Sequence, residues 1–456
     1  MLNRRDFIRT AAGAGVAIAA GKSLAEGRTA PILRVGIVSD SQGYPDPHDW
    51  GFHNLERAFE VLAREGIDVL VNAGDIADTP DEIEGLAYVQ ELERRHFGAR
   101  KPIDVACLGN HELGFRAEKD RALAERNLKR FCEIYGYPPG QLVHKVIRGY
   151  DFITFSRWED VGYDAAAIAA IRGALDAAVA RDPSKPIFVV THFHPQHTVV
   201  GSEGEAGAPL RELFNGYPQV VSLSGHSHCP LQDERAIWQG EFTALETSTT
   251  SYGCLPNEYA NLCNGILPWG RESVGFTILE VYADRLEFRR WQAEDQQPMK
   301  GGRPWVVNLP YRPSEAVYTE ERRRTEEMAP AFTDGTPFLF RYDYGYAYFV
   351  FDQARHPDLV HHYRLELTEL DGEGRPVGEP RSWKFLGNFY RYARNRDSRL
   401  CFKVPPHAMK AGTRYRARMF PVANFGTEGR PLEMDVRVRA SYRFRNDAKA
   451  VPYPQE

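Results

Sequence analysis

Five short polar clusters carry side chains that could bind divalent metal ions. They combine carboxylate, amide and imidazole groups, and several of these groups stand next to a glycine, which allows a tight turn. Oxygen donors together with imidazole nitrogen suit ions such as manganese, magnesium, iron and zinc. The residues that could ligate a metal are, in chain order, Asp40, Gln42, Asp75, Asn110, His192, His226 and His228.

Each cluster directly follows a short apolar run that is typical of a buried strand. The apolar runs are residues 33–39, 69–73, 103–108, 187–191 and 220–224. Residues at the carboxyl ends of strands in an α/β sheet meet in one crevice, where sites usually form. The sequence therefore predicts a single metal site built from all five clusters.

These five motifs, in this order, resemble those of the calcineurin-like metallophosphoesterase superfamily, over most of residues 32–291. The resemblance implies an α/β fold of four layers, in which two sheets are flanked by helices. It also implies two divalent ions that share Asp75 as a bridging ligand. One ion would be held by Asp40, Asp75 and His228, and the other by Asp75, Asn110, His192 and His226.

The resemblance further implies the chemistry. His111 would lie near the substrate phosphate and protonate the leaving oxygen or stabilise charge there, and Asp78 would orient it. Two ions roughly 3.5–4 Å apart make hydroxide available near neutral pH for in-line attack on phosphorus. We therefore expect a hydrolase of a small phosphorylated substrate, whether a phosphomonoester, a phosphodiester or a diphosphate.

One position departs from the family pattern. The first motif is usually Asp-x-His, and here Gln42 stands in place of the histidine. An amide oxygen is a harder ligand than imidazole, so manganese is expected ahead of iron, zinc or magnesium. The same Asp-x-Gln occurs in a branch that resembles manganese-dependent ADP-ribose/CDP-alcohol diphosphatases.

Other residues near these motifs have two interpretations each. His194 could line the pocket or cap a turn, and Glu112 is expected to be structural. Aromatic side chains on loops could contact substrate but more often pack locally. The aromatic candidates are Tyr44, Tyr252 and Trp269, and the histidines expected on the surface or on a helix are His48 and His53.

The elements that must position the site alternate along residues 31–294, which we predict to be the catalytic domain. Helices are predicted over 52–65 and 165–180, with a further strand at 152–156 and a hairpin over 274–281 and 285–291. Alternating strands and helices favour an α/β core. Residues 295–330 are rich in proline, glycine and charge, and predict a linker with one short helix.

Residues 331–446 predict a second domain of a different class. Apolar and polar residues alternate around Leu365, Ala417 and Val436, which is typical of strands with one buried face. The region resembles a fibronectin type III β-sandwich, with Tyr415 at its tyrosine corner. Residues 447–456 are predicted to be a tail.

The N-terminus predicts export. Arg4-Arg5 precedes an apolar run from Ala11 to Ala20, which resembles a twin-arginine signal ending near residue 30. The machinery that reads such signals would then be a partner, and the mature protein would be periplasmic or extracellular. The run is too short to span a membrane, so no stable membrane insertion is expected. A disordered basic tail is the alternative interpretation.

Composition narrows the remaining functions. The 456 residues imply two domains, and the net charge of −5 gives no basic field for binding nucleic acid. The six cysteines lack a CxxC pair, so a zinc–thiolate site is not expected; Cys254 and Cys263 could pair, or both could be buried thiols.

A second hypothesis makes the chain an exported binding protein whose metal site is a relic and whose sandwich engages a glycan or a protein.

Overall fold

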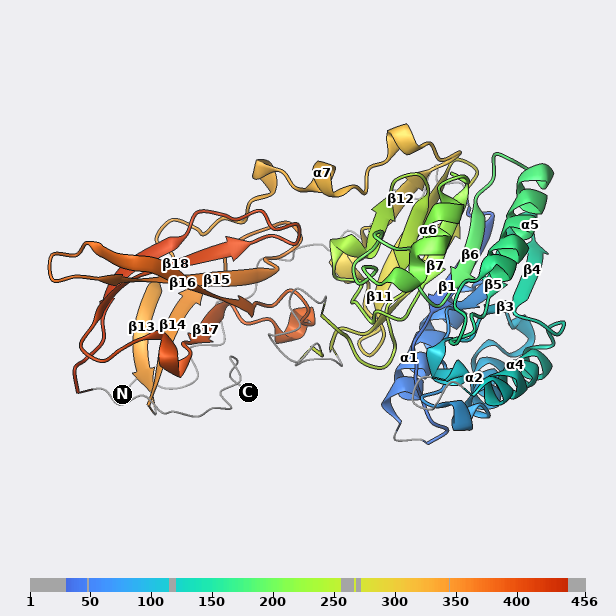
Figure 1. Ribbon diagram of the computed structural model, residues 1–456, viewed down its shortest axis with the longest axis horizontal. Coiled ribbons are helices and arrows are strands. Elements are labelled where there is room, and N and C mark those ends of the chain that lie inside the picture. Colours follow the sequence, from blue (N-terminus) through green and yellow to red (C-terminus); the bar gives the residue numbers. More distant parts are fainter. Residues whose placement is uncertain are drawn as a thin grey trace, which may run out of the picture.

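The computed structural model describes residues 30–46, 49–114, 120–255, 266–267, 272–343 and 345–441. The predicted signal and tail fall outside these residues, as do His48, Cys263 and Trp269. The described chain forms an α/β domain and an all-β domain, which lie side by side and are joined by the segment that carries α7 (Glu320–Arg323) (Figure 1). No helix within these ranges is both long enough and apolar enough to cross a membrane.

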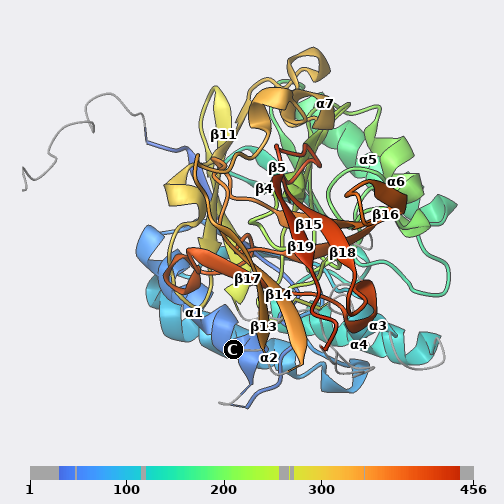
Figure 2. The same ribbon diagram turned by 90° about the vertical axis from the view of Figure 1, so that its left-hand side faces the viewer.

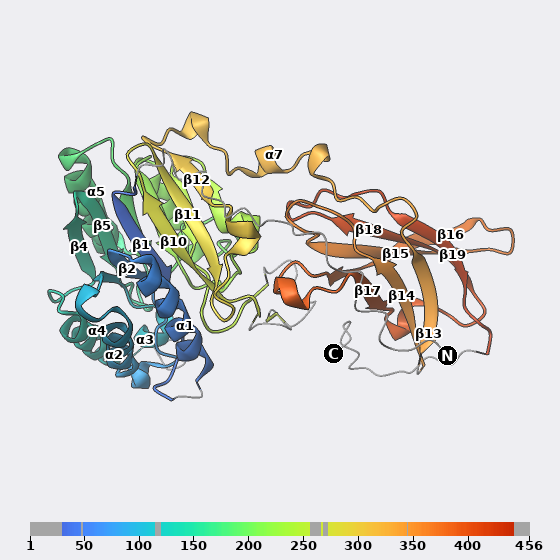
Figure 3. The same cartoon turned by 180° about the vertical axis from the view of Figure 1, so that it is seen from behind.

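Two six-stranded mixed sheets form the centre of the α/β domain. Their strand orders are β12-β11-β10-β1-β2-β3 and β4-β5-β6-β7-β9-β8. Figure 3 shows β10, β11 and β12 beside β1 and β2 in the first sheet. The first sheet contains β1 (Leu33–Val38), β2 (Val69–Asn72), β3 (Ile103–Ala106), β10 (Gly275–Val281), β11 (Arg285–Gln292) and β12 (Trp305–Asn308). The second contains β4 (Leu142–Ile147), β5 (Tyr150–Phe155), β6 (Ile187–Thr191), β7 (Val220–Ser224), β8 (Ile237–Gln239) and β9 (Thr243–Glu246).

The strands are apolar on both faces because each sheet is covered twice. Val35 and Ile37 of β1 pack into the core between the sheets, whereas Val38 packs against helices. The outer face of the first sheet is covered by α1 (Trp50–Glu65), α2 (Gly85–Phe97) and α4 (Arg121–Tyr135), and that of the second by α5 (Ala165–Arg181) and α6 (Ala208–Phe214). The predicted four-layer α/β fold is therefore confirmed.

Helix α1 shows how local signals set these elements. The Asp49 carboxylate accepts the N–H of Phe52 at 2.7 Å and caps the start, and Gly66 ends the helix with a left-handed φ of 70°. Its apolar stripe is buried against the first sheet. Gly36 of β1 permits this close approach, because a Cβ there would lie 2.9 Å from Leu62.

The segment predicted as a linker contributes to the fold. Within residues 295–330, β12 pairs antiparallel with β11 at the edge of the first sheet. The strand has only four residues and sits among prolines and glycines, so its apolar pattern is too short to predict a strand. The predicted short helix corresponds to α7.

The C-terminal domain packs a three-stranded antiparallel sheet against a four-stranded one; Figure 2 views the molecule from this end. Tyr363, Leu365 and Leu367 are buried and alternate with more exposed residues, as predicted. The Tyr415 hydroxyl accepts the N–H of Lys410 at 3.0 Å. The strands are β13 (Phe338–Asp343), β14 (Tyr346–Asp352) and β17 (Arg399–Lys403), and β16 (Pro376–Leu386), β15 (His362–Leu370), β18 (Arg414–Val422) and β19 (Leu432–Arg437).

Candidate metal centre

The predicted ligands come together where the two sheets present their carboxyl ends. Strands β1 and β2 are parallel neighbours in the first sheet, and β6 and β7 are parallel neighbours in the second. The residue after each of these strands therefore turns toward the same space. The short helix α3 (Asn110–Leu113) follows β3 and adds Asn110 and His111.

The first donor cluster consists of Asp40, Asp75 and His228. One ligand atom from each lies within 4.8 Å of the others, and all three residues are buried. His228 Nε2 lies 3.2 Å from Asp40 Oδ1, and its Nδ1 lies 3.0 Å from the carbonyl of Tyr252. A donor role for Nδ1 leaves Nε2 as the nitrogen that faces the carboxylates.

The second cluster consists of Asp75, His192 and His226, and obeys the same 4.8 Å limit. His192 Nε2 lies 3.0 Å from Asp75 Oδ2 and 3.1 Å from Asn110 Oδ1. His192 Nδ1 lies 2.8 Å from the carbonyl of Ala73, which fixes the ring. Asp75 is thus shared by both clusters, the position that a bridging ligand would hold.

The main chain is strained where these donors are carried. Five of the seven predicted ligands have a left-handed backbone, with φ between 41° and 70°. Non-glycine residues seldom adopt this conformation, and it clusters at functional sites. The strained residues are Asp40, Gln42, Asp75, His226 and His228.

Glycines allow the strands to bring the donors close. A Cβ at Gly109 would collide with the Asp75 carboxylate, and a Cβ at Gly225 would collide with Asp40. The glycines of the third and fifth motifs are therefore required by the close approach of the acidic ligands.

The buried charges shift one another's protonation. Burial alone would raise the pKa of Asp75, but the facing His192 imidazole outweighs it and the pKa lies below its usual range. Burial alone would lower the pKa of His192, and Asp75 instead raises it to about 10. Burial, reinforced by the neighbouring His192, lowers the pKa of His226 to about 3. The lowered pKa of His226 favours its neutral form, in which imidazole binds metals, whereas His192 would release its proton when a cation binds between it and Asp75.

His111 lies at the edge of the donor clusters, with Nε2 3.8 Å from Asp75 Oδ2. Its Nδ1 lies 2.6 Å from the main-chain carbonyl of Asp78 and 3.5 Å from the Asp78 carboxylate. The closer contact of Asp78 with His111 is thus through the backbone, while its carboxylate accepts the Tyr44 hydroxyl at 2.8 Å. The Gln42 amide nitrogen lies 3.0 Å from His111 Nε2.

The structure shows the contacts of the residues near the motifs whose roles the sequence left open. Glu112 is fully buried and accepts the N–H groups of Ala77 and Gly109, both at 2.8 Å, which is a structural role. His194 Nε2 lies 2.8 Å from Glu246. His53 is exposed on α1. The Tyr252 ring packs on His228, with ring centroids 4.4 Å apart.

Glu246 is a buried site residue that the sequence prediction missed. It ends β9, and one carboxylate oxygen accepts the hydroxyl of Ser227, which stands between His226 and His228, at 2.5 Å. A polar residue at the end of an apolar run is the same signal that identified the ligands. The run Thr243–Glu246 is too short for that signal to stand out.

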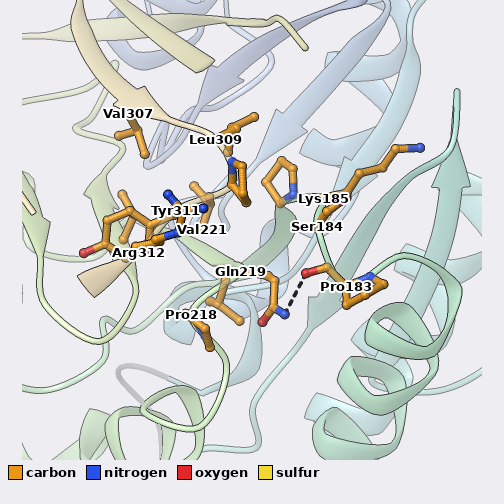
Figure 4. Close-up of a pocket in the computed structure, with 14 residues that line it drawn as sticks. Pro183, Ser184, Lys185, Pro218, Gln219, Val221, Val307, Leu309, Tyr311 and Arg312 are labelled. Carbon is orange, nitrogen blue, oxygen red and sulfur yellow. Dashed lines mark hydrogen bonds between the residues drawn. The ribbon is translucent and has the colours of Figure 1, made fainter. Parts of the chain in front are cut away.

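A cavity of about 190 Å³ lies away from these donors (Figure 4). It is lined by Pro183 and Lys185, which precede β6, and by Gln219, which precedes β7. These positions are at the amino ends of the two strands, whereas His192 and His226 follow the carboxyl ends. The strands therefore separate this cavity from the metal centre.

Comparison with known families agrees with the geometry. Residues 33–230 match the family of calcineurin-like phosphoesterases, and this range contains all seven predicted ligands. The chain thus contains a calcineurin-like metallophosphoesterase domain. No curated protein matches the sequence significantly.

Solved structures with a similar fold include three phosphate-processing proteins. A dimetal phosphatase from Danio rerio is 11% identical, covering 62% of this chain and 100% of that one, with a TM-score of 0.39. Purple acid phosphatase PPD1 from yellow lupin (Lupinus luteus) is 14% identical, covering 60% and 53%, with a TM-score of 0.43. A 5'-nucleotidase precursor from Thermus thermophilus is 13% identical, covering 60% and 53%, with a TM-score of 0.31. Because these TM-scores are low, the solved structures add no argument. The assignment of the domain rests on the family match and on the geometry of the donor clusters.

Proposed function

We propose that the protein is an exported, dinuclear-metal phosphohydrolase. The observation that carries this proposal is the pair of donor clusters that share Asp75 at the carboxyl ends of four strands. One ion would be held by Asp40, Asp75, His228 and Gln42, and the other by Asp75, Asn110, His192 and His226. The twin-arginine motif Arg4-Arg5 supports export to the periplasm or the cell exterior.

The residues fit two divalent cations. The buried Gln42 Oε1 atom has no hydrogen-bond donor among the described residues, and a cation would satisfy this acceptor. Asp75 and Asp40 bring two buried carboxylates, whose charge a metal would balance. The predominance of oxygen donors around Gln42 favours manganese in that site, with iron, zinc or magnesium as the alternatives.

The residues around the ions would donate the proton to the leaving group and stabilise charge on the phosphoryl oxygens. The contact of His111 Nδ1 with the Asp78 carbonyl fixes the ring, so that Nε2 points toward the donors. That nitrogen would hold the proton for the leaving oxygen of the ester. The Asn110 side chain would add an amide dipole beside the phosphoryl oxygens. Two divalent ions, when bound, supply a hydroxide nucleophile near neutral pH and neutralise phosphate charge.

A metal-by-substrate activity matrix tests the proposal. The mature protein would be loaded with manganese, magnesium, zinc or iron and assayed on p-nitrophenyl phosphate, bis-p-nitrophenyl phosphate and ADP-ribose. Turnover of any of these supports the proposal, and the preferred compound identifies the ester class. A protein that binds two ions but cleaves none of the three would refute it.

The variant His111→Ala separates chemistry from metal binding. We expect it to lower turnover by about 10²–10⁴-fold, because the proton donor is lost, while two ions remain bound. His53→Ala, which changes an exposed histidine on α1, is the matched control and should leave both quantities unchanged. Metal content measured by mass spectrometry accompanies each rate. An unaltered rate in His111→Ala would remove the role assigned to this residue.

A further inference from the structure

The segment after β7 connects the metal centre to the C-terminal domain. It begins with Gly225-His226-Ser227-His228 and reaches Asp233 and the short turn Glu234–Ala236 within eight residues of His228. The first part carries two predicted ligands, and the second part is buried against the sandwich. The two domains therefore meet on the same segment that holds His228.

A polar contact forms the first connection. The Tyr390 hydroxyl of the sandwich donates to Asp233 Oδ2 at 3.2 Å, and His361 Nε2 lies 2.9 Å from the same hydroxyl. One residue further on, the N–H of Glu234 donates to Asn424 Oδ1 of the sandwich at 2.8 Å. All of these residues are buried, so the contacts exclude water and hold the segment in one conformation.

An apolar contact forms the second connection. Leu255 and Leu267 of the α/β domain pack in one cluster with sandwich residues, among them Tyr390. Leu255 directly follows Cys254, whose N–H donates to the carbonyl of His228 at 3.0 Å. The sandwich members of this cluster are Leu386, Phe389 and Tyr390. They pack with Leu255, the residue next to the one that hydrogen-bonds to His228.

We infer that the C-terminal sandwich braces the metal centre, and that Tyr390 is the positioning residue through which it fixes His228. Tyr390 belongs to both connections, through its hydroxyl and through its ring. His228 has a left-handed φ of 54°, a strained backbone that persists only when its surroundings fix it. The inference rests on the proposed function, because it takes His228 as a ligand of the ion shared with Asp40.

The test is the affinity of the full-length protein for each of two ions, measured by titrating the metal-free protein with Mn²⁺ and Co²⁺. Tyr390→Phe keeps the ring but removes the bond to Asp233. We expect it to weaken one of the two ions by about tenfold, the lower end for partners that orient metal ligands. The other ion should keep its affinity within about twofold, and the Co²⁺ spectrum of the weakened site should change.

Tyr363→Phe is the matched control. Tyr363 is another buried sandwich tyrosine, and its hydroxyl accepts the N–H of Ala354 inside the same domain. It should lower thermal stability without changing either ion affinity. Phe389→Leu, which shortens the apolar connection, should act in the same direction as Tyr390→Phe.

The outcomes are distinguishable. If Tyr390→Phe and Phe389→Leu leave both affinities at the wild-type values, or weaken both ions equally as a general loss of stability would, the brace is refuted while the phosphohydrolase proposal stands. A wild-type protein that fails to bind two ions or to turn over any phosphoester refutes the proposed function instead. Selective weakening of one ion, absent from Tyr363→Phe, supports the brace.

Discussion

At the scale of single residues, the metal centre is held in strained backbone conformations. A non-glycine residue in a left-handed or otherwise rare conformation costs about 1–3 kcal/mol. Neighbouring hydrogen bonds keep the ligands there: the N–H of Asp40 donates to the carbonyl of Gly74 at 3.0 Å, and that of Gln42 to the carbonyl of Asp75 at 2.9 Å. The first two motifs therefore hold each other in place, and Asp75 takes part through its backbone as well as its side chain.

Gln42 should set the metal preference. In Gln42→His an imidazole replaces the amide beside His111, and nitrogen is a softer donor than an amide oxygen. We expect zinc affinity relative to manganese to rise by about tenfold. Competitive titration of the metal-free protein measures this ratio.

The matched control for this substitution is Gln297→His, which places a new histidine on the surface. It should leave the ratio unchanged. The same metal preference in Gln42→His as in the unchanged protein would mean that Gln42 is not a ligand.

At the scale of elements, the ends of β6, β7 and β9 are tied together beneath the ligands. Glu246 at the end of β9 accepts the Ser227 hydroxyl, accepts the N–H of Ser248 at 2.8 Å and lies 2.8 Å from His194. Ser227 lies between the predicted ligands His226 and His228, which follow β7. His194 lies two residues after His192, the predicted ligand that follows β6. One buried carboxylate therefore fixes both histidine motifs.

Glu246→Ala should destabilise the protein strongly. It leaves the Ser227 hydroxyl and the Ser248 N–H without their acceptor and His194 without its neighbouring carboxylate, and each buried polar group left unsatisfied costs about 1–3 kcal/mol. Ser227→Ala removes two hydrogen bonds, the one to Glu246 and the one from the N–H of Cys229, and should cost about 2 kcal/mol. Urea unfolding followed by circular dichroism compares the two variants. Equal unfolding midpoints for Glu246→Ala and the unchanged protein would show that this carboxylate does not hold the strand ends.

The elements that the sequence predicts are those with local signals. Largely apolar runs of five or six residues mark β1, β6 and β7, and apolar residues at helical spacing mark α1, whose Asp49 cap the prediction did not use. The ordered polar motifs after these runs predicted the five residues of the two donor clusters, and the structure places Asn110 beside His192 and Gln42 beside His111. Short strands such as β8 and β12 gave no such signal, since a run of three or four residues fits several structures.

At the scale of the whole molecule, the contact between the domains could not be predicted from the sequence. Asp233, Tyr390 and Asn424 are far apart in the chain and follow no periodic pattern, so only the tertiary fold brings them together. Glu234 places a buried carboxylate beside this interface. Its carboxylate accepts Arg290 Nη1 at 2.8 Å and Trp305 Nε1 at 2.7 Å, while its backbone reaches the sandwich.

The α/β domain beside this interface should lose stability in acid. Burial alone would raise the pKa of Glu234, but Arg290 and Lys300 outweigh it and lower the pKa from 4.5 to about 2. A carboxyl with a depressed pKa stabilises the folded state above its unfolded value, and this contribution disappears as the pH falls from about 4.5 to about 2. The shift corresponds to roughly 3 kcal/mol, at 1.36 kcal/mol for each pKa unit. Urea unfolding at pH 7, 4, 3 and 2 measures it.

Glu234→Gln tests the origin of this pH dependence. The neutral amide leaves Arg290 without its carboxylate, so the variant should be less stable than the unchanged protein at pH 7. Between pH 4.5 and 2 its stability should fall less steeply, because the titrating group is gone. Glu373→Gln alters a carboxylate with a 71% exposed side chain and should reproduce the slope of the unchanged protein. If Glu234→Gln also kept that slope, the acid sensitivity would come from other carboxylates and not from the buried Glu234–Arg290 pair.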